Sequence, residues 1–252
     1  MEETEQRILM GNEAIGRGLV EEGCALAAAY PGTPASEILA SVVAFAKETG
    51  VPLHAEWSVN EKVACETALA NSMAGRRSAV AMKQVGLNVA ADPLTRAAYL
   101  GVKGGFILIA ADDPGPQSSQ TEQDSRLFGL FAKTPVLDPS SPREAREMVA
   151  EAFTLSEQHE MPVILRPTTR VCHARQNVSC RTPLPMERKA HFEKNPGRWV
   201  ATPQYLTGLH RLLNDKLDRI AADQAFAPKL LAGDGSIPGT CVIASGVSFA
   251  HA

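Results

Sequence analysis

Short apolar runs alternate along the first two thirds of the chain with segments in which apolar residues recur every three or four positions. The apolar runs predict buried strands, and the periodic segments predict helices that pack one face against them. The predicted strands span 24–30, 53–55, 78–82, 106–110, 136–137 and 162–166, and the predicted helices span 11–22, 34–49, 61–75, 86–101 and 142–158. This alternation favours an α/β fold with a mostly parallel open sheet and helices on both faces.

The pattern changes after Thr168. We expect a first domain over 1–170, an extended, proline-punctuated connector over 171–203, and an amphipathic helical segment over 204–230. The stripe of that helix consists of Leu206, Leu209, Leu213, Leu217 and Ile220. Residues 231–252 read as the start of a second α/β domain, with a strand and turn over 241–246. Because this unit is only begun, we expect the sequence to be the amino-terminal part of a longer protein.

Polar, turn-rich segments follow several of the predicted strands. They carry Thr33, Glu61, the run Gly86-Leu87-Asn88, and a polar loop over 112–126. In an open parallel sheet, ligands bind beyond the carboxyl ends of the strands. We therefore expect a ligand site where these segments meet.

Glu61 has two interpretations. Ser58 and Glu61 have the spacing of a capping box, in which Ser58 is the N-cap and Glu61 bonds back to its amide. Alternatively, Glu61 is a buried acid at the mouth of a helix face of small residues, which a flat ligand can approach. That face consists of Cys65, Ala68, Ser72 and Gly75. Thr33 likewise fits an N-cap, with Pro34 at the first helical position.

Composition narrows the class of protein. The 252 residues are 44% hydrophobic and carry a net charge of -3 with no basic run, which argues against a nucleic-acid partner. No apolar stretch is long enough to cross a membrane, and the polar, acidic amino terminus is unlike a signal peptide. The five cysteines lack the Cys-x-x-Cys spacing, so we expect reduced thiols, a cytoplasmic protein and no metal site in this chain.

Ordered motifs along almost the whole chain resemble the indolepyruvate branch of the 2-oxoacid:ferredoxin oxidoreductase family. These motifs are Tyr30-Pro31-Gly32-Thr33-Pro34, Asn60-Glu61, Val85-Gly86-Leu87-Asn88, 110–114, Ser118-Ser119-Gln120, Glu122-Gln123-Asp124, 162–169 and Arg198-Trp199-Val200. Members of that family bind thiamine diphosphate between two domains of similar fold. The resemblance implies that this chain is the domain that holds the pyrimidine.

The resemblance also assigns residues. Glu61 matches the glutamate that hydrogen-bonds the pyrimidine ring, a task that needs a carboxyl whose pKa is raised by burial. Thr33 matches a position near substrate and cofactor, and Gly86, Leu87 and Asn88 match a loop that lines the pyrimidine pocket; an N-cap and an ordinary helix start are their structural alternatives. Ser119, Gln120 and Gln123 are expected to face the substrate or a partner domain. Arg126 is either a ligand for a substrate carboxylate or a solvated surface arginine.

The implied reaction is the oxidative decarboxylation of aryl 2-oxoacids to acyl-coenzyme A, with ferredoxin as the electron acceptor. A second, beta-type subunit, a homodimeric core, magnesium and iron–sulfur clusters would belong to the remainder of the protein. Two alternatives stay open: a non-redox 2-oxoacid decarboxylase with the same domain, and a non-catalytic assembly module. Gly233-Asp234-Gly235 spells a diphosphate-site signature, but we interpret it as a turn because too few residues follow it.

Overall fold

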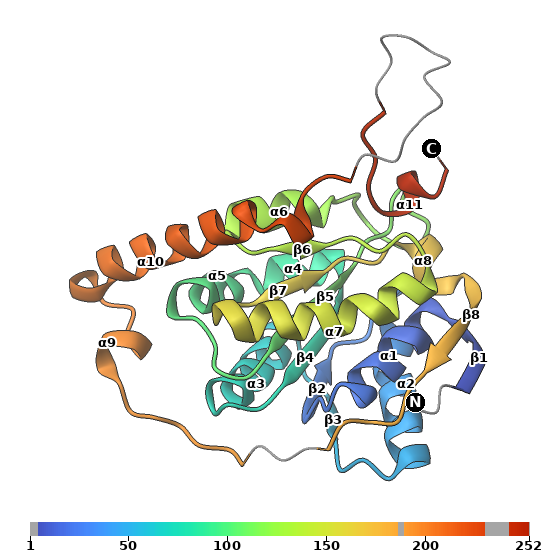
Figure 1. The fold of residues 1–252 in the computed structure, drawn as a ribbon, viewed down its shortest axis with the longest axis horizontal. Helices are drawn as coiled ribbons and strands as arrows, with labels where there is room; N and C mark the ends of the chain where they lie inside the picture. Colours follow the sequence, from blue (N-terminus) through green and yellow to red (C-terminus); the bar gives the residue numbers. More distant parts are fainter. Residues whose placement is uncertain (1–4, 186–188, 230–241, 252) are drawn as a thin grey trace.

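The core of the fold is a six-stranded parallel sheet (Figure 1). The computed structural model describes residues 5–185, 189–229 and 242–251. The strands lie in the order β3-β2-β4-β5-β7-β6, and every neighbouring pair is parallel. They are β2 (Leu26–Ala29), β3 (His54–Trp57), β4 (Ser78–Lys83), β5 (Phe106–Ala111), β6 (Val136–Leu137) and β7 (Val163–Leu165). The predicted fold class is confirmed.

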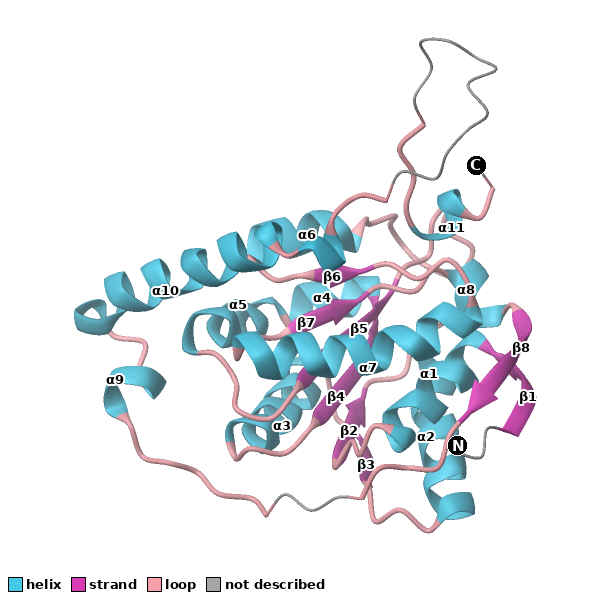
Figure 2. Cartoon of the chain, viewed as in Figure 1, coloured by secondary structure: helices cyan, strands magenta, loops and turns pink. Residues whose placement is uncertain are grey.

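Helices cover both faces of this sheet (Figure 2). Successive side chains of a strand point to opposite faces, so Ala27 and Ala29 join one core layer and Ala28 joins the other. One layer is built by α1 (Gly11–Glu21), α2 (Ser36–Thr49) and α7 (Pro142–His159), and the other by α3 (Glu61–Met73), α4 (Gln84–Val89), α5 (Ala91–Leu100) and α6 (Ser125–Ala132). Burial on both faces explains why the strands are continuous apolar runs.

The hydrophobic pattern did not predict several elements of the structure. A separate two-stranded antiparallel sheet joins β1 (Glu5–Met10) to β8 (Arg175–Cys180), and β8 lies inside the range predicted as a connector. Its sequence is mostly polar because only Val178 and Cys180 are buried. The short α8 (Thr169–His173) and α9 (Pro196–Trp199) were also not predicted, and α6 begins within the segment predicted as a polar loop.

The amphipathic helix is confirmed as α10 (Pro203–Ala222), which packs on α5. Leu209 and Leu213 are buried, whereas Leu206 is 42% exposed. The short η1 (Gln224–Phe226) follows. Residues 242–245 are irregular and lead into α11 (Gly246–Phe249), so the described part of the strand predicted over 241–246 is not a strand. Cys241 and Gly233-Asp234-Gly235 lie outside the described residues.

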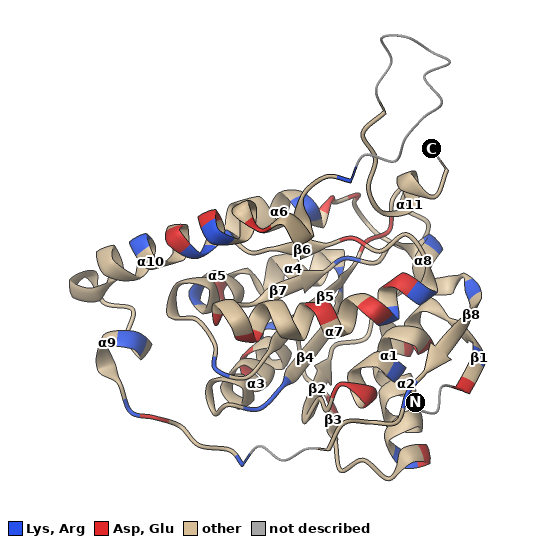
Figure 3. Ribbon diagram, viewed as in Figure 1, with Lys and Arg blue, Asp and Glu red and all other residues tan. Residues whose placement is uncertain are grey.

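The helices of the described residues include none that is both long and apolar enough to cross a membrane. The four described cysteines, Cys24, Cys65, Cys172 and Cys180, are buried free thiols. Positive and negative side chains are interspersed along α7 and α10 (Figure 3).

A buried carboxylate ties α1, α7 and the segment after β8 together. Glu21 is 1% exposed, accepts hydrogen bonds from Arg17 Nε and the Arg181 amide, both at 2.7 Å, and pairs with Arg146. Arg17 and Arg146 are themselves buried. Removing one member of such a group leaves buried charges without compensation.

We predict that Glu21→Ala lowers the free energy of unfolding by about 3–5 kcal/mol, because Arg17 and Arg146 lose their buried counter-charge. Denaturant unfolding of the purified protein measures this. The control is Asp92→Ala, which breaks the exposed pairs with Lys62 and Arg96 and should cost no more than about 1 kcal/mol. Equal effects of the two variants would contradict the prediction.

Candidate functional site

The carboxyl ends of four adjacent strands bring the predicted polar segments to one edge of the sheet. The Thr33 turn follows β2, Glu61 follows β3, Gln84 follows β4, and the 112–124 loop follows β5. Since β3, β2, β4 and β5 are neighbours and parallel, their ends coincide. The expectation of a shared edge is confirmed.

Glu61 contacts the segment that follows β4 rather than capping its own helix. The cap of α3 is Asn60, whose side chain accepts a hydrogen bond from the Val63 amide at 2.9 Å, so the capping box with Ser58 is wrong. Ser58 stands two residues too early, and its hydroxyl donates to Glu56 at 3.4 Å. The carboxyl of Glu61 lies against Gly86: a Cβ on Gly86 would stand 2.4 Å from Oε1.

Glu61 is half-buried, and the small residues below it have another task. Cys65, Ala68 and Ser72 are fully buried in the core layer between α3 and the sheet. The Ser72 hydroxyl donates to the Gly104 carbonyl at 2.5 Å, which draws α3 close to the loop before β5. Close helix–sheet packing, rather than burial of Glu61, is thus what the small face provides.

The Thr33 turn differs from the predicted helix start. The Thr33–Pro34 peptide is cis, and α2 begins at Ser36 with Ala35 as its N-cap. The amide of Ala35 donates to the Gly32 carbonyl at 2.7 Å, and the Gly32 amide donates to Ser36 Oγ at 2.9 Å. These bonds fold 32–35 into a turn, so Thr33 is not an N-cap and is left exposed at the edge.

The predicted helix over 86–101 is two helices, because the chain breaks at Ala90 between α4 and α5. Gly86, Leu87 and Asn88 therefore lie inside α4 and do not open it. Leu87 is fully buried in the core and Asn88 is exposed. Gly86 is the member of this run that touches Glu61.

Two adjacent aspartates hold the long loop after β5 at both of its ends. Asp113 accepts hydrogen bonds from the Gln117 and Ser118 amides at 3.1 and 2.9 Å and from Ser119 Oγ at 2.7 Å. Asp112 is fully buried and binds the far end of the loop through the Ser125 amide at 2.9 Å.

Each aspartate is also tied to the β7 side of the sheet. Asp112 pairs with Arg166 Nε at 2.6 Å, and Asp113 accepts from Thr169 Oγ1 at 2.9 Å. Burial raises the pKa of Asp112, and Ser125 and Arg166 offset part of this. Burial would also raise the pKa of Asp113, but its hydrogen bonds from Ser118, Ser119, Thr169 and Gln117 outweigh it and lower that pKa to about 2.

Gln84 connects this loop to α4. Its side-chain Nε2 donates to Ser119 Oγ at 2.9 Å, and its backbone carbonyl accepts from Gln123 Nε2 at 3.0 Å. The side chain is fully buried, yet Oε1 has no hydrogen-bond partner among the described residues. Ser119 and Gln123 thus contact Gln84 at the start of α4, whereas Gln120 is exposed.

Sequence reasoning missed three residues of this edge: Lys83, Gln84 and Asp113. One signal was available, since Lys83 and Gln84 are polar residues directly after the strand predicted over 78–82. The sequence around Asp113 does not indicate its hydrogen-bond partners, because these depend on how the loop after β5 folds back.

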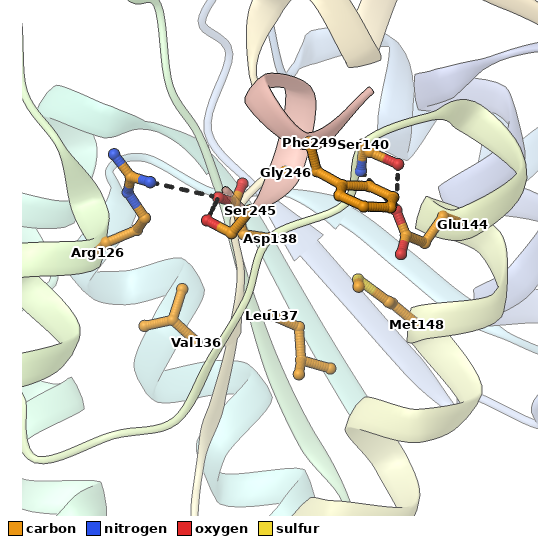
Figure 4. Close-up of a pocket in the computed structure, with 10 residues that line it drawn as sticks. All are labelled: Arg126, Val136, Leu137, Asp138, Ser140, Glu144, Met148, Ser245, Gly246 and Phe249. Carbon is orange, nitrogen blue, oxygen red and sulfur yellow. Dashed lines mark hydrogen bonds and ion pairs between the residues drawn. The ribbon is translucent and has the colours of Figure 1, made fainter. Parts of the chain in front are cut away.

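Arg126 does not join the edge around Glu61. Its Nε and Nη2 contact the Asp124 carboxylate at 2.9 and 2.7 Å, and Nη1 lies 3.6 Å from Asp138. It lines a cavity of about 450 Å³ beside β6, which Phe249 and Met148 also line (Figure 4). Its charge is committed to two aspartates there.

A family model and several curated relatives match this chain. The family model described as pyruvate flavodoxin/ferredoxin oxidoreductase, thiamine diphosphate-binding, matches residues 17–211. The indolepyruvate oxidoreductase subunit IorA of Thermococcus kodakarensis is 45% identical over 98% of this chain and 39% of its own length. The subunit of the same name from Methanothermobacter thermautotrophicus is 43% identical over 98% of this chain and 40% of its own.

A relative of lower identity and a solved structure also match this chain. The 2-oxoglutarate synthase subunit KorA of Methanothermobacter marburgensis is 24% identical over 78% of this chain and 54% of its own length. A solved 2-oxoglutarate:ferredoxin oxidoreductase from Magnetococcus marinus matches with a TM-score of 0.67 and 18% identity, over 89% of this chain and 46% of that one. This structural match shows the fold alone. The chain spans about 40% of the length of the IorA relatives it matches.

The low pKa of Asp113 predicts a pH-dependent contribution to stability. A carboxyl whose folded pKa is lowered stabilises the protein above its unfolded pKa, near 4, and loses this contribution as the pH falls towards 2. We expect Asp113→Asn to destabilise the protein by about 1–3 kcal/mol at pH 7. Denaturant unfolding of both proteins across pH 7 to 2.5 should show the difference shrinking below pH 4; a constant difference would contradict this assignment.

Proposed function

The chain belongs to the thiamine-diphosphate-binding family of the pyruvate flavodoxin/ferredoxin oxidoreductases, and from this premise we propose that it provides the pyrimidine half of a thiamine diphosphate site in a 2-oxoacid oxidoreductase. The observation that carries the proposal is the Glu61 carboxyl, which lies against the bare Cα of Gly86 at the carboxyl edge of the sheet. Among the described residues it has no hydrogen-bonding partner, so it is free to bind a ligand.

The surroundings of Glu61 fit a flat aromatic ring that a second domain covers. Trp57 is 49% exposed and Val59 is 79% exposed just before α3, and Val63 and Val89 are also exposed. We interpret these exposed apolar side chains as part of the surface that a ligand and a second domain cover. Glu61, Gly86 and Asn88 would hold the pyrimidine and Thr33 would lie towards the substrate, with Leu87 fixing α4 in the core.

Thiamine diphosphate, when bound, supplies a carbon nucleophile and an electron sink for decarboxylation. The contribution of this chain is to hold a proton on Glu61 at the pyrimidine ring nitrogen, which requires a carboxyl that the covering domain buries. Ser119 and Gln123, fixed through Gln84, shape the substrate side. The described residues contain no cluster of three or more His, Cys, Asp or Glu side chains suited to a metal. We assign magnesium, the diphosphate site and the iron–sulfur clusters to the rest of the protein.

We further propose that the complete protein converts an aryl 2-oxoacid, coenzyme A and two oxidised ferredoxins to acyl-coenzyme A, carbon dioxide, two reduced ferredoxins and one proton. The support is the 41–45% identity to indolepyruvate oxidoreductase subunits, compared with 24–25% to 2-oxoglutarate synthase subunits. A beta-type subunit, a homodimeric core and a cytoplasmic location complete the proposal, and the buried free thiols agree with that location.

The experiment that tests the function is 2-oxoacid-dependent dye reduction by the complete complex. We expect the complex to reduce dye faster with indolepyruvate and phenylpyruvate than with 2-oxoglutarate. Decarboxylation without dye reduction, in a protein free of iron, would instead identify a non-redox decarboxylase. The absence of any turnover from a fully loaded complex would favour an assembly module.

Glu61→Gln should lower the turnover of the complete complex by about two to four orders of magnitude, because the amide cannot exchange the proton that the reaction needs. Dye reduction at saturating thiamine diphosphate measures the loss. The matched control is Glu66→Gln, an exposed position on the same helix, which should keep wild-type turnover. Near-wild-type activity of the Glu61 variant would refute its role.

Gly86→Ala should lower turnover through the position of Glu61, because the added methyl would stand 2.4 Å from Oε1 and displace the carboxyl. We expect a loss of about one to two orders of magnitude, less than for Glu61→Gln. Gly208→Ala, in α10 with open space around the added methyl, is the matched control and should leave turnover unchanged. Equal activity of the two alanine variants would show that the contact does not matter.

A further inference from the structure

We propose that Lys83 binds the carboxylate of the 2-oxoacid substrate and thereby selects for an anionic substrate. This inference rests on the proposed function, because it assigns a residue to that substrate. A 2-oxoacid is an anion at neutral pH, so a site at this edge needs a cation, and Arg126 is committed elsewhere.

The position of Lys83 follows from the register of the sheet. Ala29, the last residue of β2, pairs with Ala81, whereas β4 continues for two more residues alongside β5. Lys83 is the final residue of β4 and pairs with Ala111. It therefore stands beyond the end of β2, where the Thr33 turn leaves the sheet.

The Lys83 side chain runs between that turn and the loop after β5. A Cβ on Gly32 would lie 3.1 Å from Lys83 Cβ and 3.5 Å from Cδ, so the aliphatic stem crosses Gly32. Its Nζ donates to the Ser118 carbonyl at 2.6 Å, and Ser118 Oγ lies 3.4 Å from the Thr33 carbonyl. The ammonium group is thus held where the Thr33 turn meets Ser118. In the sequence, Lys83 lies three residues before Gly86, which contacts Glu61.

The charge of Lys83 is uncompensated within the part of the chain that the structure describes. None of the ion pairs there involves it, whereas Lys62 pairs with Asp92 and Lys103 with Glu160. An ammonium group has three donors, and the Ser118 carbonyl uses one of them. Two donors remain for a carboxylate.

Two other cations near this edge, Arg126 and Arg166, are already paired. Arg126 contacts Asp124 and Asp138, and Arg166 is buried among Asp112, Asp138 and Asp124. Lys83 is therefore the described cation between the Thr33 turn and the 112–124 loop that can accept a substrate anion without first losing a carboxylate partner.

The test uses the complete, loaded complex and the variants Lys83→Met and Lys83→Arg. We expect Lys83→Met to raise KM for an aryl 2-oxoacid about 10- to 100-fold, the effect of losing a charged hydrogen bond, and to change KM for coenzyme A less than twofold. Lys83→Arg should recover most of the affinity. Lys103→Met, at the opposite end of β5, is the matched control and should retain wild-type values.

A binding measurement separates substrate recognition from a structural role in holding Ser118. Titration calorimetry compares 3-phenylpropanoate with its neutral amide. Wild type and Lys103→Met should prefer the anion at least about tenfold, and Lys83→Met should bind the two ligands equally. A loosened loop would instead weaken both ligands and preserve the preference.

The outcomes distinguish this inference from the proposed function. If the wild-type complex reduces dye with aryl 2-oxoacids but Lys83→Met keeps its KM and its preference for the anion, the assignment of Lys83 is overturned and the function stands. If the wild-type complex has no 2-oxoacid-dependent activity and binds neither ligand, the proposed function fails and the assignment of Lys83 fails with it.

Discussion

The parallel pairing of β4 with β2 on one side and β5 on the other is the constraint on which the site depends. Parallel strands end at the same edge, so segments far apart in sequence must meet there. The pairing also decides details: β4 outlasts β2 by two residues and places Lys83 beside the Thr33 turn. Any change of this register would move Lys83 and Gln84 away from the loops that they hold.

The loop after β5 shows how the protein orders a long polar segment beside that edge. Twelve residues separate Asp112 from Ser125, yet their hydrogen bonds make the two ends of the segment neighbours. Asp113 gathers 117–119 in the same way. Burying two adjacent carboxylates is unfavourable unless each is well hydrogen-bonded, and here each has several donors. The loop thereby gains a defined shape without secondary structure of its own.

Several groups at this edge lack the partners that buried or charged groups normally have. The Glu61 carboxyl, Gln84 Oε1 and the Lys83 ammonium group all have unused hydrogen-bonding capacity among the described residues. Exposed Trp57 and Val59 lie close to Glu61 in the sequence. Unused polar capacity together with exposed apolar surface is typical of a half-site that a ligand and a second domain complete.

The sequence by itself determined the sheet, the helices on its faces and the edge that carries the site. The reason is that hydrophobic periodicity can be read within short windows of the chain, and the alternation of strands and helices then indicates parallel strands. It could not predict β8, since its partner β1 lies about 170 residues away and only two of its side chains are buried. It also left Glu61 between two interpretations. The tertiary structure decided that point, because the contact with Gly86 and the capping by Asn60 depend on how α3 and α4 meet. The same holds for Arg126 and Lys83, which carry the same charge in the sequence. In the structure, Asp124 and Asp138 pair with Arg126, whereas Lys83 has no carboxylate partner among the described residues.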